Sequence, residues 1–125
     1  MSSRSLFTQI FVLNLVLISS QAMAGDADNG QKVFKSQCTA CHSNQPGKNI
    51  VGPSLYGVVG RKAGQIPGFY YSEANKSSGL TWDAATLDRY LTSPRGVVPG
   101  TLMTYPGLKD DAKRADLISY LATLK

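Results

Sequence analysis

The sequence predicts an all-α protein with three main helices, one short helix and long loops. Three windows carry apolar residues at the spacing of an amphipathic helix, and we find no convincing strand pattern and no internal repeat. Residues 43–79 are instead rich in glycine and proline, which is typical of loops. A loop of this length is uncommon in a small domain, so it makes sense mainly if it wraps around a bound group.

The first 24 residues have the pattern of a secretory signal peptide. Arg4 provides the positive start, residues 6–18 are an apolar run, and an Ala-Met-Ala cleavage site ends at Ala24. The run is shorter than the roughly 20 residues that a membrane span needs. We expect cleavage before Gly25, with an uncleaved anchor as the alternative. Residues 25–125 then form a single domain, and the loss of Arg4 lowers the formal net charge of +5 by one.

The first predicted helix covers residues 26–37. Asp26 is suited to its N-cap, and Val33 and Phe34 can face inward together with Ala27. A glycine within a helix costs about 1 kcal/mol relative to alanine. We therefore interpret Gly30 as a point where another helix crosses closely.

Two further segments are predicted to be helical before the chain end. Residues 72–76 can form one short turn that begins at a serine cap. The second main helix covers residues 83–92, with Thr81 or Asp83 as its cap and Pro94 as its stop. Another loop follows.

The last predicted helix covers residues 110–124. Asp110 suits its positively polarised start. Its apolar stripe consists of Leu117, Leu121 and Leu124, with Ile118 beside it.

The motif CTACH at residues 38–42 contains both cysteines and the only histidine of the chain. The C-x-x-C-H spacing attaches a c-type haem, because both thiols lie on one face of a turn and the histidine can reach the iron. A thioredoxin-like motif normally follows a strand, whereas the residues before Cys38 look helical. A zinc site needs four ligands, and only three are present. A local disulfide remains an alternative to haem attachment through Cys38 and Cys41.

Six-coordinate haem iron needs a ligand opposite His42, and a second histidine is excluded. Of the three methionines, only Met103 lies beyond the predicted signal peptide. A lone methionine usually fills a core, but given a haem we interpret Met103 as the second ligand. An open five-coordinate iron or a lysine ligand is the alternative.

Ligation by histidine and methionine raises the reduction potential and fills both axial positions. No iron position is then left for a substrate, which favours electron transfer over catalysis. The rival functions are a haem protein with an open iron, such as a peroxidase or gas-binding protein, and a thiol-disulfide oxidoreductase. The mildly basic charge is not gathered into a stripe, which disfavours nucleic-acid binding and suits an acidic protein partner.

Over nearly all of residues 25–125 the chain resembles a class I cytochrome c, of the bacterial cytochrome c2 and mitochondrial type. Several motifs in the right order carry the resemblance: CTACH at 38–42, VGPSL at 51–55, GRKAG at 60–64, GFYYSEANK at 68–76, LTW at 80–82 and PGTLM at 99–103.

The resemblance implies roles for individual residues. Pro53 accepts a hydrogen bond from the imidazole of His42, and Leu55 packs on the porphyrin. The haem propionates are bound by Arg61, Tyr71 and Trp82. A polar network beside Met103 consists of Asn75, Tyr90 and Thr101. Gly30 and Phe34 cross the last helix near Leu117 and Tyr120.

The chain departs from the family pattern around the exposed haem edge. Gln37, Gly96 and Leu102 stand where the family is frequently basic, although Arg95 and Lys109 remain. Tyr105 is the usual aromatic residue after the methionine ligand. Charge steering of partners is thereby weakened, while ligation is untouched.

The resemblance also implies a function and a location. We expect a soluble, monomeric one-electron carrier with one haem, in the periplasm and without stable membrane insertion. A bc1-type complex, a terminal oxidase and a photosynthetic reaction centre are all compatible partners.

Overall fold

The computed structural model describes residues 25–125, and the predicted signal peptide lies outside these residues. Five helices follow in chain order: α1 (Ala27–Gln37), α2 (Glu73–Lys76), α3 (Ala84–Thr92), α4 (Pro94–Val97) and α5 (Asp111–Leu121). The described part holds one isolated antiparallel bridge, between Lys62 and Thr81, and it contains no β-strand. None of its helices is long and apolar enough to cross a membrane.

The predicted helices are confirmed, with two differences. First, an additional short helix, α4, begins at Pro94, where the sequence predicted only the end of the preceding helix and a loop. Pro94 occupies the first turn of α4, where a missing N–H costs nothing, and Ser93 accepts a hydrogen bond from the Gly96 N–H. The last helix ends at Leu121 rather than at residue 124.

Four helix starts are capped by the side chains that the sequence indicated. Asp26, Ser72, Asp83 and Asp110 each accept hydrogen bonds from main-chain N–H groups two or three residues later. These bonds satisfy donors that the first helical turn leaves without partners. Between the two possible caps of α3, the structure selects Asp83 over Thr81.

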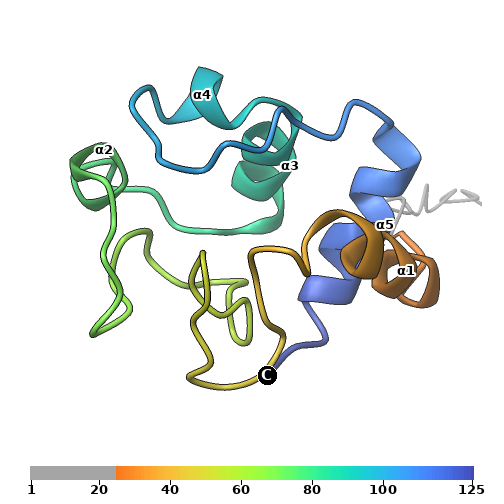
Figure 1. Cartoon of the computed structure of the whole chain (residues 1–125). Coiled ribbons are helices and arrows are strands. Elements are labelled where there is room, and N and C mark those ends of the chain that lie inside the picture. Colours follow the sequence, from red (N-terminus) through yellow and green to blue (C-terminus); the bar gives the residue numbers. More distant parts are fainter. Residues whose placement is uncertain (1–24) are drawn as a thin grey trace, which may run out of the picture.

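Helices α1 and α5 lie against each other, as Figure 1 shows at the right of the molecule. Gly30 is buried at the crossing, and a Cβ atom there would collide with the main-chain carbonyl of Asp116 and with Tyr120. The rings of Phe34 and Tyr120 pack with centroids 5.4 Å apart. The close crossing inferred from the glycine is therefore confirmed.

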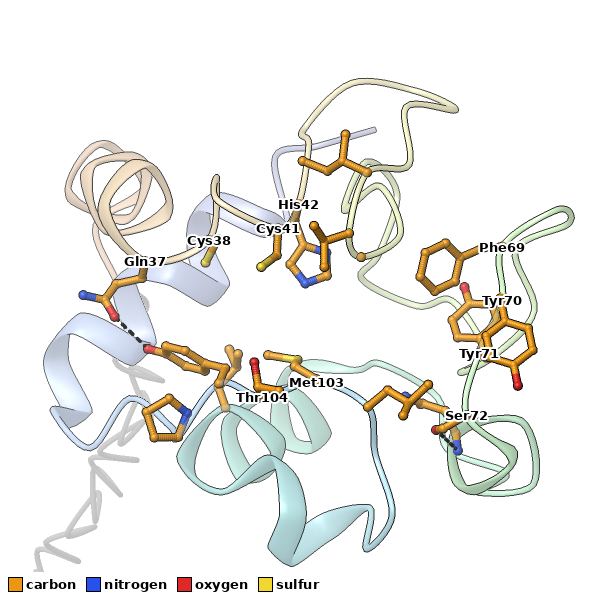
Figure 2. Close-up of a pocket in the computed structure, with 18 residues that line it drawn as sticks. Gln37, Cys38, Cys41, His42, Phe69, Tyr70, Tyr71, Ser72, Met103 and Thr104 are labelled. Atoms are coloured by element: carbon orange, nitrogen blue, oxygen red, sulfur yellow. Dashed lines mark hydrogen bonds between the residues drawn. The ribbon is translucent and has the colours of Figure 1, made fainter.

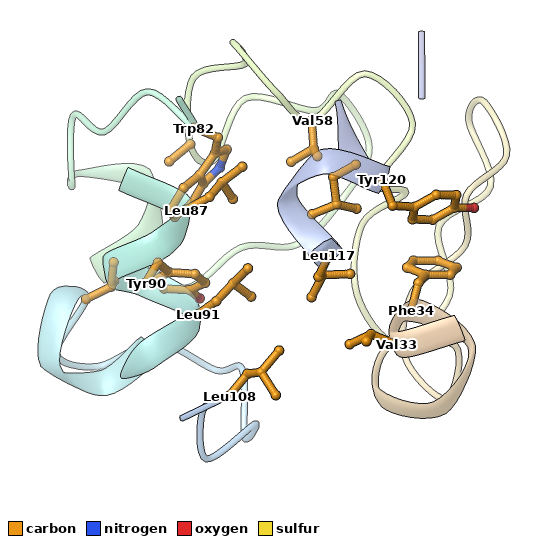
Figure 3. Packing of buried hydrophobic residues seen from close by; sticks show 13 residues of the cluster. Val33, Phe34, Val58, Trp82, Leu87, Tyr90, Leu91, Leu108, Leu117 and Tyr120 are labelled. Atoms are coloured by element: carbon orange, nitrogen blue, oxygen red, sulfur yellow. The ribbon is translucent and has the colours of Figure 1, made fainter. Parts of the chain in front are cut away.

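Leu117 of α5 is 1% exposed and lies at the centre of the hydrophobic core. In Figure 3 it stands between the side chains of α1 and those of α3, which include Leu87 and Leu91. Arg114, on the same helix, is buried and pairs with Asp88 of α3 at 2.6 Å. These contacts fix the three main helices relative to one another.

The loop-rich segment 43–79 forms the other side of the molecule. Its hydrogen bonds tie it to the segment before α3: Gly60 N–H donates to the Trp82 carbonyl, Ala63 N–H to Leu80, and Trp82 N–H to Arg61. Figure 1 shows α3 and α4 facing this segment across the middle of the molecule. The space between the two sides holds the candidate site.

Candidate functional site

The two cysteines and the histidine leave the end of α1 in one tight turn. Cys38 is the C-cap of α1, and its carbonyl accepts hydrogen bonds from Cys41 N–H at 3.1 Å and His42 N–H at 2.8 Å. Figure 2 shows both sulfur atoms and the imidazole on the same side of the turn. All three side chains line one cavity of about 680 Å³.

The His42 ring is oriented from behind by the loop that follows. Its Nδ1 lies 2.7 Å from the carbonyl oxygen of Pro53. A carbonyl only accepts, so Nδ1 carries the proton and Nε2 keeps its lone pair. Burial lowers the pKa of His42, with the Pro53 hydrogen bond acting in the opposite direction, so the ring is neutral at neutral pH. Gly52 passes so close that a Cβ atom there would collide with the imidazole.

Met103 lies on the opposite wall of the same cavity (Figure 2). The Tyr90 hydroxyl is 3.4 Å from its sulfur and 3.2 Å from Thr101 Oγ1. The same Thr101 oxygen accepts the Met103 N–H at 3.2 Å. Burial raises the pKa of the Tyr90 phenol, and side-chain hydrogen bonds with Thr101 and Asn75 act in the opposite direction. The network implied by the resemblance is thus assembled around the sulfur, although Thr101 itself lines neither cavity.

A second cavity of about 110 Å³ continues the first toward the core. The two share Cys38, His42, Tyr71, Asn75, Leu91 and Met103, so they form one continuous slot. The smaller part is lined by Pro53, Leu55, Arg61, Trp82 and Tyr90, among others. The sequence analysis gave twelve residues a role in attaching, ligating or surrounding the haem, and all of them except Thr101 line this slot.

Arg61, Tyr71 and Trp82 lie at the inner part of the slot. Arg61 donates to the carbonyls of Ser54 at 3.0 Å and Tyr56 at 3.3 Å, which leaves further N–H donors of its guanidinium for another acceptor. The Tyr71 hydroxyl accepts from Ile66 N–H at 3.3 Å and can still donate. The Trp82 ring packs on Tyr90, with centroids 4.7 Å apart.

The donor set fits a c-type haem. The slot is mostly apolar, it carries two thiols and an imidazole on one wall, and it carries a thioether on the other. Its inner end holds donors suited to carboxylates. In the larger cavity no lysine, arginine, aspartate or glutamate is among the lining residues. A flat apolar macrocycle with iron at its centre and two acidic groups at one edge matches each of these features.

The thiol of Cys38 does not have the character of a catalytic redox thiol. Burial, with a further effect of Cys41, raises the pKa of Cys38 to about 11. A catalytic thiol of the C-x-x-C type needs a lowered pKa, because the thiolate is the nucleophile. The site therefore disfavours the thiol-disulfide oxidoreductase that the motif alone left open.

Two features of the site had no signal in the sequence that identified their role. Gly52 belongs to a motif that carried the resemblance, but its contact with the imidazole requires the loop to fold back on the turn. The hydroxyl of Tyr105 donates to Gln37 Oε1 at 3.1 Å, across 68 positions of sequence. Neither contact follows a local pattern.

Comparisons with known proteins agree with this fold and site. The cytochrome c family profile matches residues 27–125. Cytochrome c2 of Rhodoblastus acidophilus is 59% identical over 82% of this chain and 95% of its own length. Cytochrome c2 of Rhodopila globiformis is 52% identical over 83% of this chain and 98% of its own. The structure of cytochrome cH from Methylobacterium extorquens superposes with a TM-score of 0.74 at 51% identity, covering 79% of this chain and 99% of that one.

A small all-α fold wrapped around a slot with a C-x-x-C-H turn defines a c-type haem protein, and this chain belongs to the cytochrome c family. It carries one c-type haem bound covalently through Cys38 and Cys41. It acts as an electron carrier of a respiratory or photosynthetic chain, and its partners are redox proteins.

Proposed function

We propose that the carrier is a closed centre in which His42 Nε2 and Met103 Sδ are both axial ligands of the haem iron. The observation that supports this most directly is that the two side chains face each other from opposite walls of one slot. Both axial positions are then filled, and the chain is an electron carrier without enzymatic activity of its own.

When bound, the haem supplies one iron that cycles between the ferric and ferrous states. The chain's part is to hold the ligands in the same place in both states. Pro53 does this for His42 by fixing the ring and increasing the basicity of Nε2. Tyr90 does it for Met103, and its donated hydrogen bond withdraws electron density from the sulfur, which favours the ferrous state.

The remaining site residues are proposed to seat the porphyrin. Leu55 packs against its face, and Arg61, Tyr71 and Trp82 donate to its propionates. These carboxylates would otherwise be buried charges without partners. Asn75 and Thr101 act through Tyr90, because they hold its hydroxyl toward Met103.

Absorption spectroscopy of the haem-loaded protein tests the axial ligands. We expect a sharp α band in the reduced state and a weak far-red sulfur-to-iron band in the oxidised state. Met103→Ala should abolish the far-red band and allow the ferrous protein to bind carbon monoxide rapidly. A far-red band that is absent from the wild type, or unchanged in Met103→Ala, would contradict methionine ligation.

We further propose that residues 1–24 are a cleaved signal peptide and that residues 25–125 act as one monomeric domain in the periplasm. Intact mass of the protein purified from a periplasmic extract tests this. The expected mass is that of a chain beginning at Gly25 plus one haem, without titratable thiols. A retained N-terminal segment, found with the membrane fraction, would support the anchor instead.

A bc1-type complex, a terminal oxidase or a photosynthetic reaction centre is proposed as the partner, with a weakly basic surface of the carrier guiding the encounter. The mouth of the slot itself is apolar, since Val51, Tyr70 and Leu102 are 74%, 81% and 63% exposed. Rates of electron transfer with each purified partner, measured against ionic strength, separate the two contributions. Rates that fall as the salt concentration rises support electrostatic steering. Rates that do not change with salt indicate that docking depends on the apolar residues at the mouth of the slot.

A further inference from the structure

The segment that carries Met103 is attached to the rest of the molecule mainly near its two ends. No helix lies between Val97 and Asp111 in the described structure. Near its beginning the segment is held by Tyr90, through Thr101 and Met103. At its end it is held by Leu108, whose N–H donates to the Leu91 carbonyl at 2.7 Å and whose carbonyl accepts from Arg114 Nη1 at 2.9 Å. The Lys109 ammonium also donates to the Thr92 carbonyl. Except for the bond from Arg114 of α5, these attachments lead to α3, which lies on the same side of the slot as Met103.

Between these attachments, a single hydrogen bond connects the segment to the opposite side. Among residues 104–107 of the described chain, the only hydrogen bond is the one from the Tyr105 hydroxyl to Gln37 Oε1, at 3.1 Å. It is the dashed line at Gln37 in Figure 2. Gln37 is the last residue of α1 and directly precedes Cys38, so the bond joins the methionine wall to the cysteine wall.

The two partners differ in how firmly they are held. Gln37 ends a helix that packs along α5, so its main chain is fixed by the core. Tyr105 is half-buried and packs against the edge of the core cluster with its ring, while its hydroxyl reaches across the slot. The ring contact and the hydrogen bond are therefore separable, because a phenylalanine would keep the first and lose the second.

We propose that Tyr105 and Gln37 form a latch that keeps the methionine segment closed over the haem and so sets how readily Met103 leaves the iron. Tyr105 and Gln37 are positioning residues, since neither contacts the iron and they act through Met103. The inference rests on the proposed ligation by Met103. An open segment exposes the iron to an external ligand, so the latch determines the apparent affinity for such a ligand.

Imidazole binding to the ferric, haem-loaded protein measures the open fraction. Loss of the far-red band reports displacement of Met103. A net hydrogen bond of ordinary strength makes the open form about two- to tenfold more populated when it is lost. Tyr105→Phe and Gln37→Ala should each raise the apparent imidazole affinity by that factor. The double variant should show no more than either single variant, because both remove the same bond.

Two controls separate the latch from a general loss of structure. Tyr56→Phe removes a hydroxyl that lies outside both cavities, and it should leave imidazole affinity unchanged. In a Met103→Ala background, Tyr105→Phe should also have no effect, since no sulfur remains to be displaced. Hydrogen exchange of residues 101–108 should be faster in Tyr105→Phe, while that of α1 and α5 stays as in the wild type.

The proposal is overturned if Tyr105→Phe binds imidazole like the wild type, if the two single effects add in the double variant, or if the effect persists without Met103. Absence of the far-red band in the wild-type protein would contradict ligation by Met103. The spectrum of the wild type is therefore recorded before any latch variant is made. The two failures are therefore distinguishable.

Discussion

The imidazole of His42 is oriented by two neighbouring residues of the loop that follows it, Gly52 and Pro53. Pro53 accepts its Nδ1 proton, and Gly52 makes room for the ring by having no side chain. A hydrogen bond that raises ligand basicity is effective only if the ring stays in one orientation. The site therefore requires glycine at position 52, because any side chain there would displace the imidazole.

Gly52→Ala should disturb the site more than its small size suggests. The added methyl group collides with the imidazole, so either the ring or the 51–55 loop must move. We expect a loss of about 1–3 kcal/mol in the free energy of unfolding, which is the usual cost of overpacking. Guanidinium unfolding of the haem-loaded variant measures the loss of stability, and a separate measurement of the reduction potential reports the disturbance of the site. Gly47→Ala is a comparison in open space, although at a positive φ; a loss at Gly52 no greater than at Gly47 would contradict the steric argument.

At the scale of the element, α1 and α5 form the support on which the haem-attachment turn rests. Gly30 allows the two helices to touch main chain to main chain, and Asp26 N–H donates to the Asp116 carboxylate at 2.7 Å across the same interface. Because Cys38 follows directly on α1, a change in this crossing moves the turn. The distance from the site does not make the crossing irrelevant to it.

Gly30→Ala sets two opposing effects against each other. Alanine favours a helix by about 1 kcal/mol over glycine, but here its Cβ would collide with the Asp116 carbonyl and with Tyr120. The Asp116 carbonyl belongs to the main chain and Tyr120 is buried in the core, so neither can give way easily. We therefore expect the collision to dominate and the net loss to be about 1–3 kcal/mol. Gln31→Ala, on the exposed face of the same helix, should be nearly neutral. Thermal unfolding followed by circular dichroism compares them, and a stabilised Gly30→Ala would refute the close crossing.

The cap of α3 has a pH dependence of known sign. Hydrogen bonds from Thr86, its main-chain N–H first, lower the pKa of Asp83 below its ordinary value of 3.8. The charged carboxylate therefore contributes stability above the pKa of the unfolded state, and this is lost as pH falls through the folded pKa. Asparagine caps without a charge. In urea unfolding, the wild type should have a higher free energy of unfolding than Asp83→Asn at neutral pH, and the two values should converge in acid. A difference that stays constant with pH would contradict this assignment.

At the scale of the whole molecule, the haem replaces the core that the loop-rich segment lacks. Residues 43–79 contain no helix apart from α2, and several of their apolar side chains line the slot: Ile50, Val51, Leu55, Val58 and Phe69. The slot totals about 680 Å³ and about 110 Å³ in its two parts, which is large for a domain of this size. The chain and its cofactor therefore form one folding unit.

Without haem, we expect the protein to lose its cooperative unfolding transition. Without haem, the side chains on both walls of the slot lose their packing contacts at once. This loss is larger than the loss caused by any single large-to-small substitution in a core. Expression of a Cys38→Ser, Cys41→Ser variant under conditions without haem incorporation gives the material to test this. Far-ultraviolet circular dichroism should show little residual helix and no sharp melt. A cooperative transition within a few degrees of the haem-loaded protein would contradict a shared core.

The sequence by itself determined the helices, their caps and the chemistry of the attachment turn. Each depends on residues within about four positions of one another, as with Asp83 and Thr86 or with the C-x-x-C-H spacing. The start of α4 was missed because Pro94 was interpreted as a stop, although proline is equally suited to a first turn. The end of α5 was missed because no glycine or proline marks it, so the apolar spacing continued to residue 124.

Tertiary structure alone decided which distant groups meet. Arg114 was not singled out in the sequence, yet it is buried with Asp88, a partner 26 positions away. The contact of Gly52 with His42 and the hydrogen bond between Tyr105 and Gln37 likewise depend on how the loops close. Such contacts are set by the packing of whole segments, and no local spacing encodes them. The sequence therefore determined which side chains are candidates for haem ligation, and the fold decided how firmly each of these side chains is held.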